Sequence, residues 1–128
     1  MEGYIVNIEE KSLENKHFRE VLFTASRIQL VVMSLAPGED IGLETHDDVD
    51  QFIRVEGGRG KAILNGEEQA LEDGSAVVIP AGTQHNIVNS SQSEPLKLYT
   101  IYSPPEHPDG TINKTKAEAI AYEREHHG

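Results

Sequence analysis

Residues 74–89 read Gly74-Ser-Ala-Val-Val-Ile-Pro80-Ala-Gly82-Thr-Gln-His85-Asn-Ile-Val-Asn89, and this stretch decides the fold. Its two short apolar runs, Ala76–Ile79 and Asn86–Asn89, are predicted strands, and the Pro and Gly residues between them indicate a turn. Short strands that follow one another with turns between them favour a sandwich or barrel over a fold of alternating strands and helices.

The same pattern continues on both sides of this stretch. Asn65-Gly66 lies between two apolar runs and favours a type I′ hairpin turn, because both turn positions need positive φ. Ile28–Leu35 is apolar on both faces, which indicates a strand buried between layers. The further predicted strands are Arg19–Thr24, Ile28–Leu35, Gln51–Glu56, Gly60–Leu64, Glu68–Leu71 and Leu96–Tyr102. The predicted fold class is therefore all-β.

The chain changes character after the last predicted strand. Residues 103–110 read Ser-Pro-Pro-Glu-His-Pro-Asp-Gly. Proline cannot continue a central strand, so this segment is expected to end the sheet and to cross the barrel mouth. Thr115–His127 lacks Gly and Pro and is rich in Ala, Glu and Lys, which predicts a short C-terminal helix. One domain is expected over residues 1–128, with a barrel core at about 28–105 and the Pro-rich segment and helix at 103–127.

Several polar residues are predicted to face the interior of the barrel. Glu44 and His46 are two residues apart, so the strand period directs both side chains to one side, where they can hold one ion. Gln51 shares a strand face with Ile53 and Val55, which places an amide among aliphatic side chains, while Phe52, Arg54 and Glu56 share the other face. The alternative is a polar plug, in which these side chains hydrogen-bond to one another inside the barrel and bind no metal.

The spacing within residues 74–89 resembles the second motif of the cupin superfamily. That motif is a Gly, five residues, Pro, one residue, Gly, two residues, His, three residues and Asn. The positions that match it at every spacing are Gly74, Pro80, Gly82, His85 and Asn89.

An earlier segment is similar to the first cupin motif, whose ligand positions are His, His and Glu. The matching positions are Gly38, Glu44, His46, Gln51 and Gly58. Glu44 therefore stands at the position of the first His of the motif, and Gln51 stands at the position of its Glu. The set of ligands keeps one carboxylate, at a different position. The resemblance covers roughly residues 28–105 and implies a double-stranded β-helix, a jelly-roll-like barrel. It also implies a metal site built from Glu44, His46, Gln51 and His85.

A site of this composition limits the choice of metal. Its four residues bring one negative charge, as three His and one Glu would. Because two of the four donors are oxygen, harder ions gain relative to Cu or Zn. The implied cofactor is a divalent ion, with Mn, Fe, Ni and Zn all open.

Composition excludes several classes of partner and site. The formal charge of −11, from 22 acidic and 11 basic residues, repels phosphate backbones and anionic lipid, so no nucleic-acid or membrane partner is expected. There is no Cys, which excludes disulfides and thiolate ligands. The N-terminus lacks a basic, apolar leader, and no stretch reaches the roughly 18 apolar residues of a membrane span. A cytoplasmic protein is expected.

Other residues with reactive or coordinating side chains are interpreted mainly as surface groups. His107 in the Pro-rich segment is assigned to the surface, with the barrel mouth as the alternative. Tyr99 and Tyr102 are on opposite faces of the last strand, where they line the cavity or pack against the tail. The residues expected to be solvated are His17, Asp47, Asp48, Asp50, His126 and His127.

Two classes of function remain open from the sequence. The chain is similar to small single-domain cupins labelled mannose-6-phosphate isomerase-like. The first hypothesis is a metal-dependent isomerase or dioxygenase that acts on a small molecule, with Glu44, or alternatively an Asp at the barrel rim, as the available catalytic base. The alternative is a non-catalytic module that binds a small sugar-like or carboxylate ligand.

Two further expectations concern the ligand and the assembly. A phosphate needs Arg or Lys near the metal, whereas the residues beside the ligands are acidic and strand alternation points Arg54 away from the pocket. A homodimer is expected, because a short open-ended barrel leaves sheet edges that need cover and small cupins are commonly dimeric.

Overall fold

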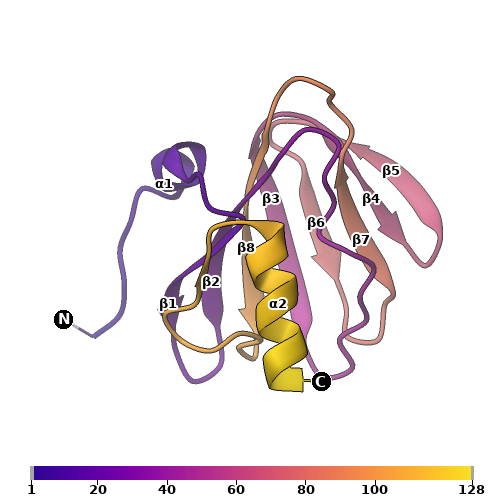
Figure 1. Cartoon of the computed structure of the whole chain (residues 1–128). Coiled ribbons are helices and arrows are strands. Elements are labelled where there is room, and N and C mark those ends of the chain that lie inside the picture. The colour runs from indigo at the N-terminus through magenta and orange to yellow at the C-terminus, as the bar shows by residue number, and fades with distance from the viewer. Residues whose placement is uncertain (1, 128) are drawn as a thin grey trace.

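Figure 1 shows the computed structural model of the chain, which describes residues 2–127. The side chains of His126 and His127 lie outside the described part, so their expected exposure is not tested. The elements are, in chain order, α1 (Ile8–Glu14), β1 (Arg19–Thr24), β2 (Gln29–Leu35), β3 (Asp50–Gly57), β4 (Gly60–Leu64), β5 (Glu67–Leu71), β6 (Ala76–Ile79), β7 (His85–Asn89), β8 (Leu96–Ser103), β9 (Ile112–Asn113) and α2 (Lys116–His127). No helix in this part of the chain is long and apolar enough to cross a membrane.

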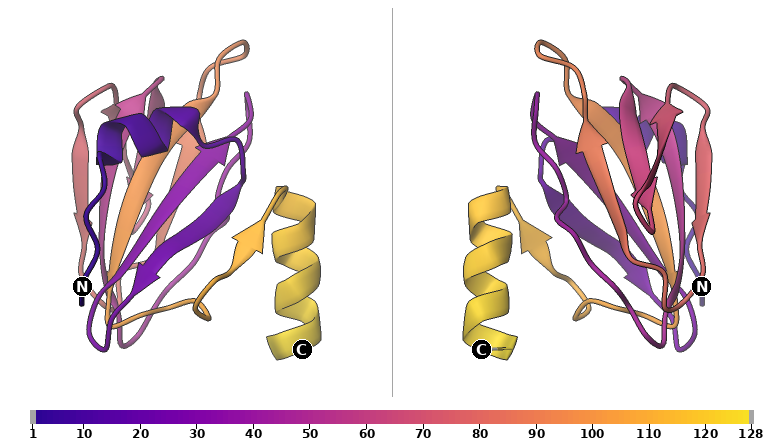
Figure 2. Two further views of the ribbon diagram at one scale, coloured as in Figure 1. Left: turned by 90° about the vertical axis from the view of Figure 1, so that its left-hand side faces the viewer. Right: turned by 90° about the vertical axis from the view of Figure 1, so that its right-hand side faces the viewer.

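The strands form two antiparallel sheets that make up the barrel (Figure 2). The larger sheet has the order β6-β3-β8-β2-β1-β9, and the smaller has the order β5-β4-β7. Residues 36–49 run as an irregular segment along β7, joined to it by the bridges Asp40↔Val88 and Glu44↔His85. This segment carries two of the predicted ligands to the edge of the smaller sheet.

The core between the sheets is mainly aliphatic, as the composition predicts. Val31, Met33, Ile53 and Leu98 are completely buried. Each belongs to a strand in which alternate residues face inward, so the two-residue period brings their side chains into one cluster. Packing in the core holds β2, β3 and β8 together. The polar residues of the candidate site lie against these strands.

The predicted elements agree closely with the observed ones. β1, β4 and β6 begin and end at the predicted residues, and the other predicted strands and α2 differ by one residue at one or both ends. Asn65 and Gly66 have φ values of 49° and 84°, as the predicted turn between β4 and β5 requires. Helix α1 was not predicted, although Asn7 caps it by accepting a hydrogen bond from the Glu10 N–H at 3.0 Å.

Two expectations about the strands need correction. Glu56 was placed on the outer face of its strand, but it is buried, because the pairing of β3 with β8 shifts register between Val55 and Gly57. The Pro-rich segment was expected to end the sheet. The chain instead returns after it as β9, which pairs with the edge of β1.

Gly58, a position of the first motif, is held in a conformation that only glycine accepts readily. Its φ is +95°, and a Cβ atom there would lie 2.5 Å from the Pro95 carbonyl oxygen. We expect Gly58→Ala to lower the free energy of unfolding by more than about 3 kcal/mol, since positive φ alone costs about 1–3 kcal/mol.

Gly66→Ala is the matched control for this prediction, because Gly66 has φ +84° but open space around the missing Cβ. Gly66→Ala should lower the free energy of unfolding only by the cost of the positive φ, without the added cost of a steric clash. Urea denaturation of both variants measures the difference, and equal losses would mean that the Pro95 carbonyl moves aside without cost.

Candidate metal centre and its cavity

The backbone brings the two motifs together. Glu44 and His85 face each other across the edge of the smaller sheet and exchange both backbone hydrogen bonds, at 2.9 and 2.8 Å. The turn before β7 is held from the same side, because the Gly82 N–H donates to the His46 carbonyl at 2.8 Å. Glu44, His46 and His85 are therefore positioned by main-chain hydrogen bonds rather than by flexible loops.

The side chains of these three residues converge on one point. Each offers a ligand atom, and these atoms lie within 4.8 Å of one another. Glu44 Oε2 is 3.7 Å from His46 Nε2, and the rings of His46 and His85 are 5.3 Å apart. The predicted convergence of Glu44 and His46 on one side is thus observed, and His85 joins them from β7.

Gln51 approaches from the larger sheet. It is buried on β3 opposite Tyr102 of β8, whose ring is 6.2 Å from the ring of His46. Its amide Nε2 donates to Thr100 Oγ1 at 3.0 Å, which leaves the carbonyl oxygen Oε1 as the free end of the side chain. The Gln51 oxygen is buried without a hydrogen-bond partner among the described residues.

His85 shows the same arrangement. Its Nδ1 donates to the Thr83 carbonyl at 2.9 Å, which assigns the proton to Nδ1 and leaves a lone pair on Nε2. His85 Nε2 is also buried without a partner among the described residues. His85 Nε2 is a buried acceptor beside the Glu44 carboxylate and the His46 ring, and Gln51 Oε1 is a second buried acceptor, on β3. Buried acceptors without partners fit a cation better than a polar plug, because a plug would satisfy its own groups. The residues present therefore fit a divalent ion.

The Pro-rich segment supplies a second carboxylate partner for His46. Glu106 Oε1 lies 3.4 Å from His46 Nδ1, on the ring edge opposite Glu44. The segment is held in place by Gln29, a buried residue of β2, whose Oε1 accepts from the backbone N–H groups of Glu106 and His107 at 3.1 and 3.0 Å. A carboxylate on the distal nitrogen of a coordinating imidazole fixes its tautomer and makes it more basic.

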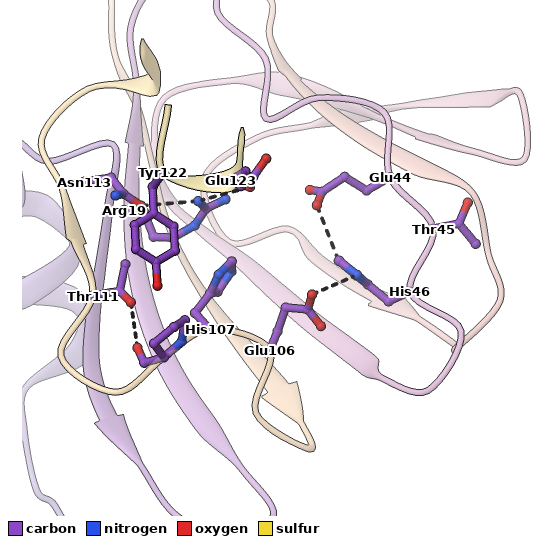
Figure 3. Close-up of a pocket in the computed structure, with 11 residues that line it drawn as sticks. Arg19, Glu44, Thr45, His46, Glu106, His107, Thr111, Asn113, Tyr122 and Glu123 are labelled. Atoms are coloured by element: carbon purple, nitrogen blue, oxygen red, sulfur yellow. Dashed lines mark hydrogen bonds and ion pairs between the residues drawn. The ribbon is translucent and has the colours of Figure 1, made fainter. Parts of the chain in front are cut away.

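A cavity of about 370 Å³ opens beside this cluster (Figure 3). The lining comes from β1, the irregular segment 36–49, the Pro-rich segment, β9 and α2. The lining residues are Arg19, Glu44, Thr45, His46, Glu106, His107, Pro108, Thr111, Asn113, Tyr122 and Glu123. Figure 3 shows the carboxylate of Glu44 and the ring of His46 on one side of the cavity and Arg19 and His107 on the other. A small molecule in this space contacts Glu44 and His46, the two candidate ligands that line it.

Burial shapes the electrostatics of the cluster. Desolvation raises the pKa of the Glu44 carboxyl above its ordinary value, while the charges of His46, Arg19 and His85 act in the opposite direction. Desolvation also raises the pKa of the Tyr102 hydroxyl well above its ordinary value, so this phenol stays protonated at neutral pH. Without a cation, the charge on Glu44 is incompletely compensated.

The remaining predicted residues lie in varied places. Asp47, Asp48 and Asp50 are exposed, as expected of a solvated loop. His17 is partly exposed and pairs with Glu20 at 2.8 Å. His107 was assigned to the surface, but the fold of the Pro-rich segment turns it into the cavity, with Nε2 3.4 Å from the Tyr102 hydroxyl.

Sequence reasoning missed four residues that shape the site. They are Arg19, Gln29, Glu106 and Glu123. Arg19 had one available signal, because it shares the two-residue period with buried Val21. The other three act through contacts between segments far apart in the chain, which no local pattern reports.

Comparison with protein families decides which group the chain belongs to. A model of the cupin domain matches residues 31–102. The chain belongs to the cupin family. The match contains all four predicted ligands and both sheets, except β1, β9 and the outer ends of β2 and β8.

This cupin has similar relatives in bacteria and in a virus. It is 49% identical over 127 residues to the uncharacterized protein YrkC of Bacillus subtilis (strain 168), covering 94% of this chain and 67% of YrkC. It is 46% identical over 119 residues to the uncharacterized protein L612 of Acanthamoeba polyphaga mimivirus, covering 91% of this chain and 74% of L612.

A solved structure confirms the fold class. The crystal structure of BH2720 from Bacillus halodurans is similar to this cupin with a TM-score of 0.90 and 46% sequence identity. The match covers 92% of this chain and 93% of BH2720. The expected all-β double-stranded β-helix with a short C-terminal helix is thereby confirmed.

Proposed function

We propose that this cupin binds a divalent metal ion through Glu44, His46, Gln51 and His85 and acts on a small polar molecule in the adjacent cavity. The proposed reaction is an isomerisation or a dioxygenation. The observation that carries the proposal is the pair of buried acceptors, Gln51 Oε1 and His85 Nε2, that lack a partner among the described residues. Each unsatisfied buried acceptor costs about 1–3 kcal/mol, and a bound cation would remove that cost.

The metal and the protein contribute different parts of the chemistry. A divalent ion of the Mn, Fe, Ni or Zn type, when bound, polarises a substrate carbonyl or hydroxyl or activates oxygen. The chain itself orients the ligands: Thr83 sets the His85 tautomer, Thr100 orients the Gln51 amide, and Glu106 holds His46. Glu44 was predicted as the base, and in the structure Glu106 and His107 add two groups that can hold a proton at the cavity wall.

One relative favours the dioxygenase reaction. This cupin is 32% identical over 78 residues to quercetin 2,3-dioxygenase of Bacillus subtilis (strain 168). The match covers 61% of this chain and 23% of that enzyme, so it concerns only a part of each protein. It supports oxygen chemistry on a small organic molecule as the first activity to assay.

A non-catalytic binding module is the second candidate, and a different relative favours it. The chain is 35% identical over 100 residues to vicilin-like antimicrobial peptides 2-2 of Macadamia integrifolia, covering 72% of this chain and 15% of that protein. That name describes no enzyme. In a binding module the same cavity would hold a small polar ligand with no bond changed.

The proposed metal site is tested by elemental analysis of protein purified without added metal. We expect a stoichiometric first-row metal in wild type and in His17→Ala, whose side chain pairs with Glu20 away from the cavity. We expect His85→Ala to lose the ion. A wild-type protein that contains no metal and takes up none of Mn, Fe, Ni or Zn would contradict the metal site and leave the polar plug or a binding module without metal.

Turnover separates the two candidate functions. Substrate-dependent oxygen uptake or carbonyl isomerisation by the metal-loaded protein supports the enzyme, and ligand-induced thermal stabilisation without turnover supports the binding module. The homodimer also stays a prediction, and gel filtration coupled to light scattering tests it.

A further inference from the structure

Arg19 is a buried cation on the wall of the cavity. It is the first residue of β1, its side chain is 4% exposed, and its guanidinium carbon lies 5.2 Å from the centre of the Phe18 ring. The strand period that buries Val21 also turns Arg19 inward, so its position follows from the fold rather than from a mobile side chain. A buried charge is costly unless it is paired.

The protein leaves this guanidinium poorly satisfied. Arginine has five N–H donors. The hydrogen bond that the described residues provide to the side chain runs from Nη1 to Asn113 Oδ1, and at 3.4 Å it is long. The closest ion pair is with Glu123 of α2, at 4.0 Å, and the Glu123 side chain is half exposed. Arg19 Nε is buried and has no hydrogen-bond partner in the part of the chain that the structure describes.

Arg19 also faces the candidate metal centre across the cavity. Both Arg19 and the Glu44–His46 pair line the same space, and Figure 3 shows them on opposite sides of it. The charge of Arg19 is close enough to lower the pKa of Glu44 and of Tyr102 against the effect of burial. A molecule between them can touch the guanidinium with one end and the ligand cluster with the other.

We propose that Arg19 binds a carboxylate group of the ligand, so that this cupin takes a small organic acid carrying a hydroxyl or carbonyl oxygen for the metal. This inference rests on the proposed function for the metal-facing end, and on Arg19 alone for the carboxylate end. A carboxylate accepts two parallel N–H bonds from the guanidinium fork, whose donors the described residues leave poorly satisfied.

The charge of the cavity favours a carboxylate over a phosphate. The described residues that line it include three carboxylates, Glu44, Glu106 and Glu123, and a single guanidinium. A phosphate dianion would add a second negative charge to this lining, whereas a carboxylate adds one. The sequence-based argument against a phosphate considered only the residues beside the ligands, and Arg19 is not one of them.

Glu123 has a definite part in this arrangement. Its carboxylate approaches the Arg19 guanidinium from α2 without reaching hydrogen-bond distance. It therefore competes with a ligand carboxylate for the same cation. Removing its charge with Glu123→Gln should tighten carboxylate binding by about two- to fivefold, the size expected for a partly exposed ion pair.

The test compares carboxylates with matched neutral molecules. Lactate and β-hydroxybutyrate are titrated into the Zn²⁺-loaded and the metal-free protein, each beside the diol in which CH₂OH replaces the carboxylate. We expect the acids to bind more tightly than the diols, and Arg19→Gln to weaken the acids by about 10- to 150-fold while leaving the diols unchanged. Arg19→Lys keeps the charge, loses the fork and should fall between.

A second measurement observes the Arg19 side chain itself and does not require that an Arg19 variant folds. In proton–nitrogen correlation spectra of wild type and Glu123→Gln, the Arg19 Nε–H resonance should move downfield on addition of lactate and stay in place with the diol. An unmoved resonance together with unchanged affinity in Arg19→Gln overturns the proposal, as does tighter binding of inorganic phosphate than of either acid. If Zn²⁺ fails to bind but lactate still moves the resonance, the metal function fails and the carboxylate site stands.

Discussion

Replacing Glu44 with Gln should lower the affinity for a divalent ion by about 10- to 150-fold, because it removes a charge-assisted contact worth about 1.5–3 kcal/mol. Glu44 is the only carboxylate among the four proposed ligands, so the variant leaves the ion with four neutral donors. Isothermal titration with the ion found by elemental analysis measures the change. Asp48→Asn is the matched control, since Asp48 is an exposed carboxylate two residues after His46 and should change the affinity little.

The same substitution should stabilise the metal-free protein at neutral pH. Burial raises the pKa of Glu44 in the folded state. A raised pKa means that the folded protein favours the protonated Glu44 carboxyl. The contribution of Glu44 to the free energy of unfolding is therefore most favourable in acid, and it is lost as the pH rises through the folded pKa. Glu44→Gln removes that loss, and its advantage over wild type should vanish below the ordinary glutamate value of 4.5.

Thermal unfolding of chelator-treated protein across this pH range tests the second effect. The two effects have opposite signs, which distinguishes a ligand from a residue that merely stabilises the fold. If Glu44→Gln binds the ion as tightly as wild type, Glu44 is not a ligand. The site would then contain two imidazoles, or the pocket would bind no metal.

Replacing Gln51 with Glu should have the reverse effects. It restores a carboxylate where the cupin motif has one, so metal affinity should rise by about 10- to 150-fold from the added charge-assisted contact. Without metal, the new carboxylate is an uncompensated charge at a position only 5% exposed, which should destabilise the protein by about 3–5 kcal/mol. The metal-induced rise in melting temperature should therefore exceed that of wild type.

Two further variants separate the carbonyl from its support. Gln51→Ala removes a neutral donor and should cost about 0.5–1.5 kcal/mol of binding, less than the loss of Glu44. Thr100→Val removes the partner of the Gln51 amide and should weaken binding without changing the number of ions bound. Titration and calorimetry on the four proteins give the ranking, and an unchanged affinity in Gln51→Glu would show that this side chain points away from the ion.

The sequence by itself determined the strands and the approach of the two motifs. Alternation between neighbouring residues is a local property, so β1, β4 and β6 were predicted to the residue. The two-residue period predicted that Glu44 and His46 point to one side, and the resemblance to the cupin motifs implied that His85 joins them, as the structure shows. The ligand role of Gln51 was also proposed on this basis, and it stays a prediction.

Tertiary structure alone decided what surrounds that cluster. Glu56 is buried because β3 and β8 shift register, and β9 forms because β1 offers an open edge. The Pro-rich segment reaches His46 because Gln29, far away in the chain, binds its backbone. Arg19 faces the ligand cluster only once β1, β9 and α2 are assembled around the cavity. Each of these contacts joins residues whose separation in sequence gives no periodic signal, so only the folded chain brings Arg19, Glu106 and Glu123 to the cavity that Glu44 and His46 line.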